Sequence, residues 1–122
     1  MDFRLKDARP IWQQLADQMT ESIVTGKFLP GERFPSVRDL ALQAGVNPNT
    51  MQRALAKLED AGLLITERTA GRSVTEEKEV LRSTRRQLAE RRVEEYLEDM
   101  KKLGFDREAA AAYASASGKE II

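Results

Sequence analysis

The 122-residue sequence contains no cysteine and no histidine. The chain therefore has no disulfide, no thiolate nucleophile and no imidazole base, and it lacks the usual ligands of zinc. Its acidic residues follow no calcium-loop pattern, and neighbouring carboxylates such as Glu94 and Glu95 point about 100° apart on a helix. We expect no catalytic residue, no cofactor and no metal ion, and hence no enzyme.

Aromatic residues are also few, at 6% of the chain, and no apolar run is long enough to span a bilayer. The first residues contain no apolar signal core, so we expect a cytoplasmic protein without a membrane partner. The 20 basic and 20 acidic residues give a net charge of zero. Any basic surface must therefore come from the placement of individual residues.

Apolar residues at helical spacing predict an amphipathic helix over about residues 10–25. A loop rich in proline and glycine follows, in which we expect Phe28, Leu29 and Phe34 to point inward. We also place Trp12 in the core. The apolar stripe of the first helix consists of Ile11, Leu15, Met19 and Ile23.

Two further helices are predicted on either side of one tight turn. Ser36 is an N-cap candidate for the first of them, which Gly45 ends. Asn47 followed by Pro48 is a typical start for the second, whose apolar residues repeat at helical spacing up to Gly62. A short turn with a glycine between two helices is typical of a helix-turn-helix.

A small β-hairpin is predicted next, with strands over residues 63–66 and 73–75 joined by a turn over 68–71. A long helix over 76–103 follows, and then an alanine-rich helix over about 107–116. We therefore expect a mostly α-helical winged helix-turn-helix, with three helices and a two-stranded wing, followed by a two-helix segment.

We expect two parts: a DNA-binding domain over residues 1–75 and a helical dimerisation segment over 76–122. A lone long helix would leave an apolar stripe exposed to water, and we expect a second copy of the chain to pack against this stripe. The expected dimer contacts are Leu88, Val93, Tyr96, Leu97, Met100 and Leu103. Two helices leave little interior, so a small-molecule effector would have to bind between subunits or between the two parts.

Basic residues fall in the parts of this motif that face DNA. Arg38 lies near the start of a helix, where the helix dipole disfavours a cation, which indicates a partner outside the chain. An internal pair with Asp39 or Glu59 is the alternative. Arg68 and Arg72 flank the hairpin tip, where they either reach phosphate or the minor groove or have no role.

The amino end of the second helix of the motif is the end that a helix-turn-helix directs into the major groove. Asparagine amides pair with adenine, and a capping role for Asn47 is compatible with contact. Gln52 and Arg53 cannot face the core, so we favour contact over a solvated surface. The residues expected at DNA are Ser36, Arg38, Asn47, Pro48, Asn49, Thr50, Gln52, Arg53, Arg68, Gly71 and Arg72.

Several strings over about residues 10–75 occur together in a characteristic order. They are Pro10-Ile11-Trp12-Gln13-Gln14-Leu15, Pro30-Gly31, Phe34-Pro35-Ser36-Val37-Arg38-Asp39-Leu40-Ala41, Val46-Asn47-Pro48-Asn49-Thr50 and Leu58-Glu59-Asp60-Ala61-Gly62-Leu63. This part of the chain resembles the GntR-family winged-helix transcription regulators, in which the counterpart of Arg38 contacts DNA. The wing departs from the usual family pattern, since Thr69 replaces a glycine and Ser73 replaces an aromatic residue. The short helical remainder resembles the YtrA subfamily, whose members carry a small dimerising segment.

The resemblance implies a sequence-specific regulator of transcription that binds double-stranded DNA as a homodimer. Two-fold pairing implies an inverted-repeat operator with half-sites about one helical turn apart. We favour a repressor over an activator, because a compact dimer on a promoter blocks polymerase without a further surface. The alternative from another class is a winged helix that serves as a protein-interaction module without sequence-specific DNA binding.

Overall fold

The computed structural model describes the backbone of residues 1–6 and 8–121 and the side chains of residues 1–6 and 8–116. The chain divides into two compact units, Met1–Arg85 and Arg86–Ile122. The boundary between them falls inside one long helix.

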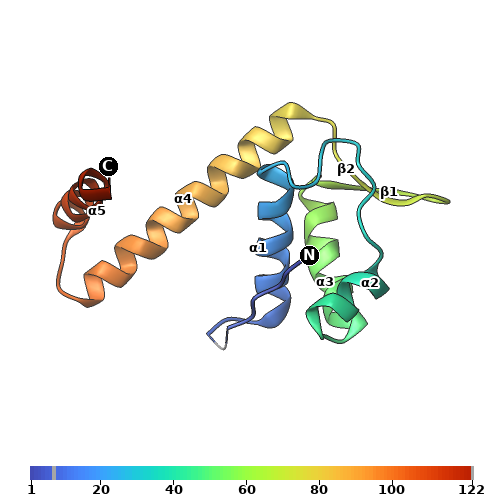
Figure 1. The fold of residues 1–122 in the computed structure, drawn as a ribbon, viewed down its shortest axis with the longest axis horizontal. Coiled ribbons are helices and arrows are strands. Elements are labelled where there is room, and N and C mark those ends of the chain that lie inside the picture. The colour runs from blue at the N-terminus through green and yellow to red at the C-terminus, as the bar shows by residue number, and fades with distance from the viewer. Residues whose placement is uncertain (7, 122) are drawn as a thin grey trace. The chain divides into compact units, whose positions relative to one another are not determined.

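The first unit consists of three helices, α1 (Ile11–Val24), α2 (Val37–Ala44) and α3 (Pro48–Asp60), and a two-stranded antiparallel sheet (Figure 1). The strands of the sheet are β1 (Leu64–Glu67) and β2 (Gly71–Val74). This order of elements confirms the predicted winged helix-turn-helix.

The caps of α2 and α3 are those that the sequence predicts. The hydroxyl of Ser36 accepts a hydrogen bond from the amide of Asp39 at 3.1 Å, and Oδ1 of Asn47 accepts one from the amide of Asn49 at 2.7 Å. Gly45 ends α2 with a φ of 68°, a left-handed conformation that suits glycine. These local interactions fix the turn between the two helices.

The wing is tighter than predicted. Leu64 pairs with Val74 and Glu67 pairs with Gly71, so the turn contains only residues 68–70. Gly71 has a φ of 77°, which lets the second strand begin directly after this short turn. The predicted strand over 73–75 therefore starts too late.

The loop between α1 and α2 runs along β2 like a third strand. The amide of Phe34 donates to the carbonyl of Arg72 at 2.8 Å, and the amide of Val74 donates to the carbonyl of Glu32 at 2.9 Å. An antiparallel bridge joins Arg33 to Ser73. The proline-rich loop is therefore an ordered part of the domain that braces the wing.

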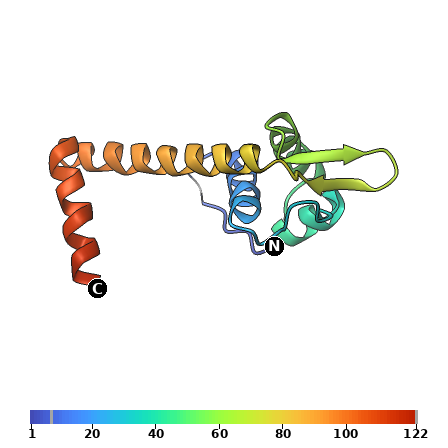
Figure 2. The ribbon, with the colours of Figure 1, turned by 90° about the horizontal axis from the view of Figure 1, so that it is seen from above.

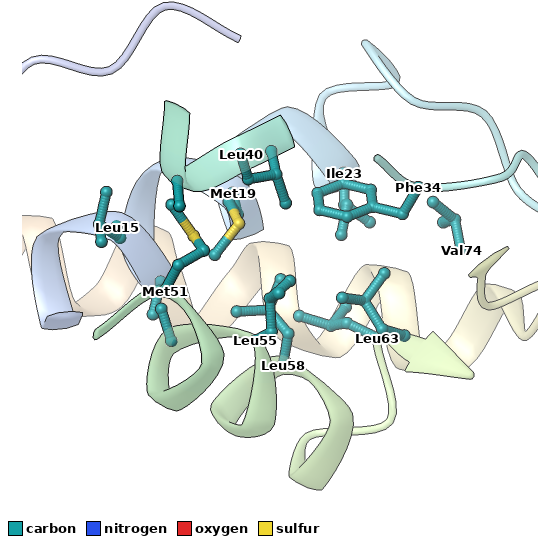
Figure 3. Close-up of a cluster of buried hydrophobic side chains, with 14 residues drawn as sticks. Leu15, Met19, Ile23, Phe34, Leu40, Met51, Leu55, Leu58, Leu63 and Val74 are labelled. Carbon is teal, nitrogen blue, oxygen red and sulfur yellow. The ribbon is translucent and has the colours of Figure 1, made fainter. Parts of the chain in front are cut away.

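The core of the first unit is mainly aliphatic, with Phe34 as its buried aromatic residue, and lies between α1, α2, α3 and the hairpin, as Figure 3 shows. Burying one side chain of this kind contributes about 1.5–3 kcal/mol. The core holds α3 by its apolar side, which leaves the opposite side of that helix exposed. Its largest fully buried side chains are Leu15, Met19, Leu40, Met51, Leu55, Leu58, Leu63 and Val74.

Three residues that we expected in the core lie outside it. Ile11 is exposed because the core begins at Leu15, one turn further along α1. Leu29 is exposed because it stands in a surface turn, where its carbonyl accepts a hydrogen bond from the amide of Glu32 at 3.0 Å. Trp12 is half-buried and lies beneath two cations of α3.

An extended segment before α1 is fastened to that helix by two glutamines, which we did not predict. The side-chain amide of Gln18 accepts from the amide of Arg4 at 2.8 Å and donates to its carbonyl at 2.7 Å. Gln14 forms the same pair of bonds with Lys6, at 2.6 and 2.5 Å. Because an amide side chain carries both a donor and an acceptor, each glutamine acts here like the backbone of a neighbouring strand.

The second unit consists of the later part of α4 (Lys78–Lys102) together with α5 (Arg107–Ile121). Figure 2 shows α5 turning away from the end of α4. The observed α5 extends beyond residue 116, where we expected it to end. Within residues 1–6 and 8–121, no helix is both long and apolar enough to cross a membrane.

Several contacts fix the corner between α4 and α5. The hydroxyl of Tyr96 donates to the carbonyl of Ala110 at 2.6 Å. The rings of Phe105 and Tyr113 meet edge to face, with their centroids 5.1 Å apart. Oδ1 of Asp106 accepts from the amide of Ala109 at 2.8 Å, which makes Asp106 the N-cap of α5.

Candidate nucleic-acid interface

The exposed face of α3 carries the polar residues that we expected at DNA. A helix turns by about 100° per residue, so Asn49, Gln52 and Arg53 lie away from the buried side and are exposed. Thr50 is half-buried at the edge of the core. The buried side of α3 consists of Met51, Ala54, Leu55 and Leu58.

The start of α3 combines a cap with an exposed surface. Asn47 and Pro48 are both exposed, and Oδ1 of Asn47 is used by the cap. The capping role of Asn47 is therefore present, and its side-chain NH₂ group is what it can offer to a ligand. The backbone amides at this helix start carry a partial positive charge that favours phosphate.

Arg38 stands one residue inside α2, close to the exposed cap residue Ser36. Its side chain is exposed, and it forms no ion pair within the described residues. The alternative of an internal pair with Asp39 or Glu59 is not what the structure shows. A cation at the positive end of a helix dipole without an internal counter-charge fits a site for an anionic ligand.

Glu59, near the end of α3, joins that helix to both strands of the wing. Its carboxylate accepts a hydrogen bond from Oγ1 of Thr66 at 2.6 Å and one from Nε of Arg72 at 2.7 Å. Burial raises the pKa of Glu59, but the hydrogen bonds from Thr66 and Arg72 and the charge of Arg72 together bring it below its ordinary value. The charged carboxylate of Glu59 therefore links α3 to both strands of the wing. We call these contacts of Glu59 with Thr66 and Arg72 the bracket.

The two arginines that we grouped at the wing occupy different environments. Arg68 lies at the exposed tip and forms no ion pair among the residues that the structure describes. Arg72 is only 17% exposed and gives its Nε to Glu59, so it holds the wing in place. Gly71 is exposed beside the tip. Of this group, Arg68 is the side chain most available to DNA.

Trp12 and Lys57 belong to this surface but were not assigned to it from sequence. The guanidinium carbon of Arg53 lies 4.2 Å from the centroid of the Trp12 ring, and Nζ of Lys57 lies 5.4 Å from it. The spacing of the two cations, four residues apart on one helix, was the available signal. Their meeting with Trp12 depends on how α1 packs against α3.

The expected dimer contacts on α4 do not share one face. Nine residues separate Leu88 from Leu97, and at about 100° per residue these two side chains point to opposite sides of the helix. Leu88 is only 7% exposed in the single chain, whereas Leu97 is half-buried.

Of the other expected contacts, Val93 and Met100 lie on the side of Leu97, whereas Leu103 comes directly after the end of α4. Val93 is 53% exposed, Leu103 is more exposed still, and Met100 is half-buried. Tyr96 is half-buried and uses its hydroxyl within the chain. A groove of about 450 Å³ at the α4–α5 corner has Leu97 in its wall.

Comparison with known proteins places this architecture in a family. Residues 11–74 match the family model described as "Bacterial regulatory proteins, gntR family". The chain is 36% identical over 108 residues to the uncharacterized HTH-type transcriptional regulator YhcF of Bacillus subtilis (strain 168), covering 88% of this chain and 89% of YhcF. It is 38% identical over 71 residues to the HTH-type transcriptional repressor YtrA of the same organism, but spans only 55% of that protein and 58% of its own length.

Solved structures of regulators in this family have the same fold. A GntR family transcriptional regulator from Listeria monocytogenes superposes with a TM-score of 0.80 at 34% identity, over 92% of this chain and 98% of that one. The DNA-binding domain of AraR in complex with operator ORX1 superposes with a TM-score of 0.55 at 26% identity, over 59% of this chain and 93% of that one. The chain therefore belongs to the gntR family of bacterial regulatory proteins and is a winged-helix transcription regulator, not an enzyme.

Proposed function

We propose that the chain is a homodimeric repressor that binds an inverted-repeat operator in double-stranded DNA. In this proposal α3 enters the major groove and the wing lies on the neighbouring backbone or minor groove. The observation that carries the proposal is the exposed amino-terminal half of α3, where Asn49, Gln52 and Arg53 point away from the core. Residues 1–75 bind DNA, and residues 76–122 pair the subunits.

The uncompensated cations favour DNA over a protein partner. Arg38 and Arg68 are exposed and form no ion pair within the described part of the chain. Although the overall charge is neutral, these arginines lie at the helix-turn-helix and at the wing tip, where contacts with phosphate require positive charge. The operator complex of the AraR domain supports the same use of this fold.

The dimer face that we propose contains fewer residues than the set of dimer contacts expected from the sequence. Val93, Leu97 and Met100 are spaced by four and three residues and therefore share one side of α4. The adjoining groove, which has Leu97 in its wall, gives a partner's apolar side chain a place to dock. Leu88 is already buried, and Tyr96 already uses its hydroxyl, within one chain.

Pairing about a two-fold axis presents two equal recognition helices, so the operator is an inverted repeat. Repression follows if this compact dimer occupies a promoter, and the name of the relative YtrA, a transcriptional repressor, supports that direction. A regulator of chromosomal genes acts where bacterial DNA lies, in the cytoplasm. We assign the groove at the corner to the partner subunit rather than to a small-molecule effector, because Leu97 belongs to both the groove and the dimer face.

Selection from a pool of random duplexes tests the proposal. Bound duplexes are recovered by band shift at 150 mM salt and sequenced, and we expect an inverted repeat with half-sites about 34 Å apart. Affinity should fall steeply with salt because bound phosphates release counterions. Recovery of sequences without a common motif would contradict the proposal and would favour the protein-interaction module.

A further inference from the structure

The indole ring of Trp12 lies beneath two positive charges of α3. Trp12 is the only tryptophan of the chain. The guanidinium carbon of Arg53 and Nζ of Lys57 are 4.2 and 5.4 Å from the ring centroid, both within the range of cation–π attraction. One half-buried ring on α1 thus interacts with two cations of the neighbouring helix.

In the part of the chain that the structure describes, these two cations have no counter-charge. Neither Arg53 nor Lys57 pairs with a carboxylate among residues 1–6 and 8–116. Like charges one turn apart on a helix repel each other, so their shared position over one ring is unfavourable unless an anion joins them. Stacking on a ring leaves the in-plane N–H groups of a guanidinium available as donors.

We propose that Trp12, Arg53 and Lys57 form a binding site for a backbone phosphate of duplex DNA, in which Trp12 is a positioning residue for the two cations. The inference rests on the proposed DNA-binding function. Long basic side chains lose rotamer freedom when they bind, and stacking on the ring restricts them beforehand. Trp12 therefore raises affinity without itself having to touch DNA.

The position of the site favours backbone contact over base reading. Base edges are read from the first residues of a recognition helix. Arg53 and Lys57 stand about 7.5 and 13.5 Å further along the axis than Pro48, at 1.5 Å per residue. Their side chains are also turned sideways, towards α1. Contacts of this kind position a protein on DNA and carry little sequence information.

A double-mutant cycle separates positioning from a general structural role. Binding of a random-sequence 30-base-pair duplex is measured at 50 mM salt, since a phosphate site acts on any sequence. We expect Trp12→Leu to weaken binding by about three- to tenfold and Trp12→Phe, which keeps an aromatic face, to bind within about twofold of the original chain. In the Arg53→Gln, Lys57→Met background, Trp12→Leu should have no further effect.

Equal weakening by Trp12→Leu in both backgrounds, or no weakening in either, would overturn the proposal. Circular dichroism checks that each variant folds. If Trp12→Leu does not fold, the test uses Trp12→Phe and the Arg53 and Lys57 variants instead, and the salt dependence of their binding is measured. Loss of Arg53 and Lys57 should reduce the slope of log affinity against log salt by about 1 to 2. The matched control Lys27→Met, an exposed lysine beyond the far end of α1, should leave the Trp12 contact and its emission response unchanged.

Tryptophan emission gives a second, independent measurement. Because Trp12 is the only tryptophan, its emission reports on this site alone. Saturation with duplex should change the emission of the original chain and of Lys27→Met, but not that of Arg53→Gln, Lys57→Met. An unchanged emission in the fully bound original chain would overturn the site. If the chain selects an operator and Arg38→Ala weakens it while all Trp12 variants bind normally, the proposed function stands and only this inference fails.

Discussion

Nε of Arg72 in the wing donates a hydrogen bond to the carboxylate of Glu59 in α3 at 2.7 Å. Arg72 is 17% exposed at its side chain, and Oγ1 of Thr66 donates to the same carboxylate. This bracket connects the recognition helix to both strands of the wing, so the two DNA-facing elements are held in one geometry. Arg72, which the sequence pattern assigned to DNA, is therefore engaged in a contact inside the protein.

The bracket predicts a pH-dependent stability. The folded-state pKa of Glu59 is lowered by its partners, so the unfolded chain binds the proton more readily. The stabilisation is therefore fully present above about pH 5 and is lost as the pH falls below about 4.3, the ordinary pKa of glutamate, through the lower folded value. Glu59→Gln should lower the free energy of unfolding by about 1 kcal/mol at pH 6.5, and by progressively less as the pH falls through the lowered folded-state pKa of Glu59.

Urea unfolding followed by Trp12 emission measures this difference. The control is Glu90→Gln, because Glu90 forms an exposed pair with Arg86 at 3.8 Å. We expect that control to differ little from the original chain at every pH. A Glu59→Gln deficit that stays constant from pH 6.5 to pH 3 would show that the carboxylate charge is not what stabilises the bracket.

Arg38 should be a major contributor to operator affinity. Its side chain is exposed and outside the core, so Arg38→Ala should leave the fold intact. We expect operator binding to weaken by about 1–3 kcal/mol, the range for one well-placed arginine contact with DNA. Titration of the selected operator measures this loss, with Lys27→Ala as a control that removes one exposed positive charge elsewhere. Equal losses in the two variants would mean that Arg38 acts only through net charge.

Sequence preference should depend on α3 and not on the wing tip. Exchanging the residues at Asn49 and Gln52 should change which bases are selected, because both side chains lie on the exposed face of the recognition helix. Arg68→Ala should weaken all duplexes by similar amounts and flatten the salt dependence. Repeating the duplex selection with each variant gives the comparison. Identical selected motifs for all three proteins would remove the assignment of base reading to α3.

The parts of the structure that could be predicted are those set by neighbours in the sequence. Ser36 with Asp39, and Asn47 before Pro48, predict the starts of α2 and α3, because a cap is completed within three residues. Apolar spacing in the same way predicts the buried side of α3. Such local rules sufficed for the winged helix-turn-helix and for its exposed recognition end.

Features that depend on packing between distant segments could not be predicted. Which of several carboxylates meets Arg72, and that Arg53 comes to rest on Trp12, are decided by the hairpin register and by the packing of α1 on α3. The expected dimer contacts on α4 stay a prediction, but their residues do not form one stripe, for a different reason. The apolar residues of α4 drift around a straight helix, so Leu88 and Leu97 look periodic in sequence but lie on opposite sides.

The proposed dimer face gives the last prediction. Leu97 and Met100 share one side of α4, and neither is fully buried in the single chain. Replacing both by Glu would place two negative charges opposite their counterparts across a two-fold axis. We expect this variant to sediment as a folded monomer at micromolar concentration, where the original chain sediments as a dimer, and to lose most of its affinity for the full operator.

The control is Lys102→Glu, which also changes the charge by two units. Lys102 is exposed and lies nine residues after Val93, so it points to the side of α4 opposite the proposed face. This control should remain dimeric and should bind the operator with little change. A dimeric Leu97→Glu, Met100→Glu variant would assign the pairing of subunits to another surface. A monomeric variant that still bound the full operator as tightly would show that one DNA-binding head is enough, because a dimer gains affinity only by engaging both half-sites at once.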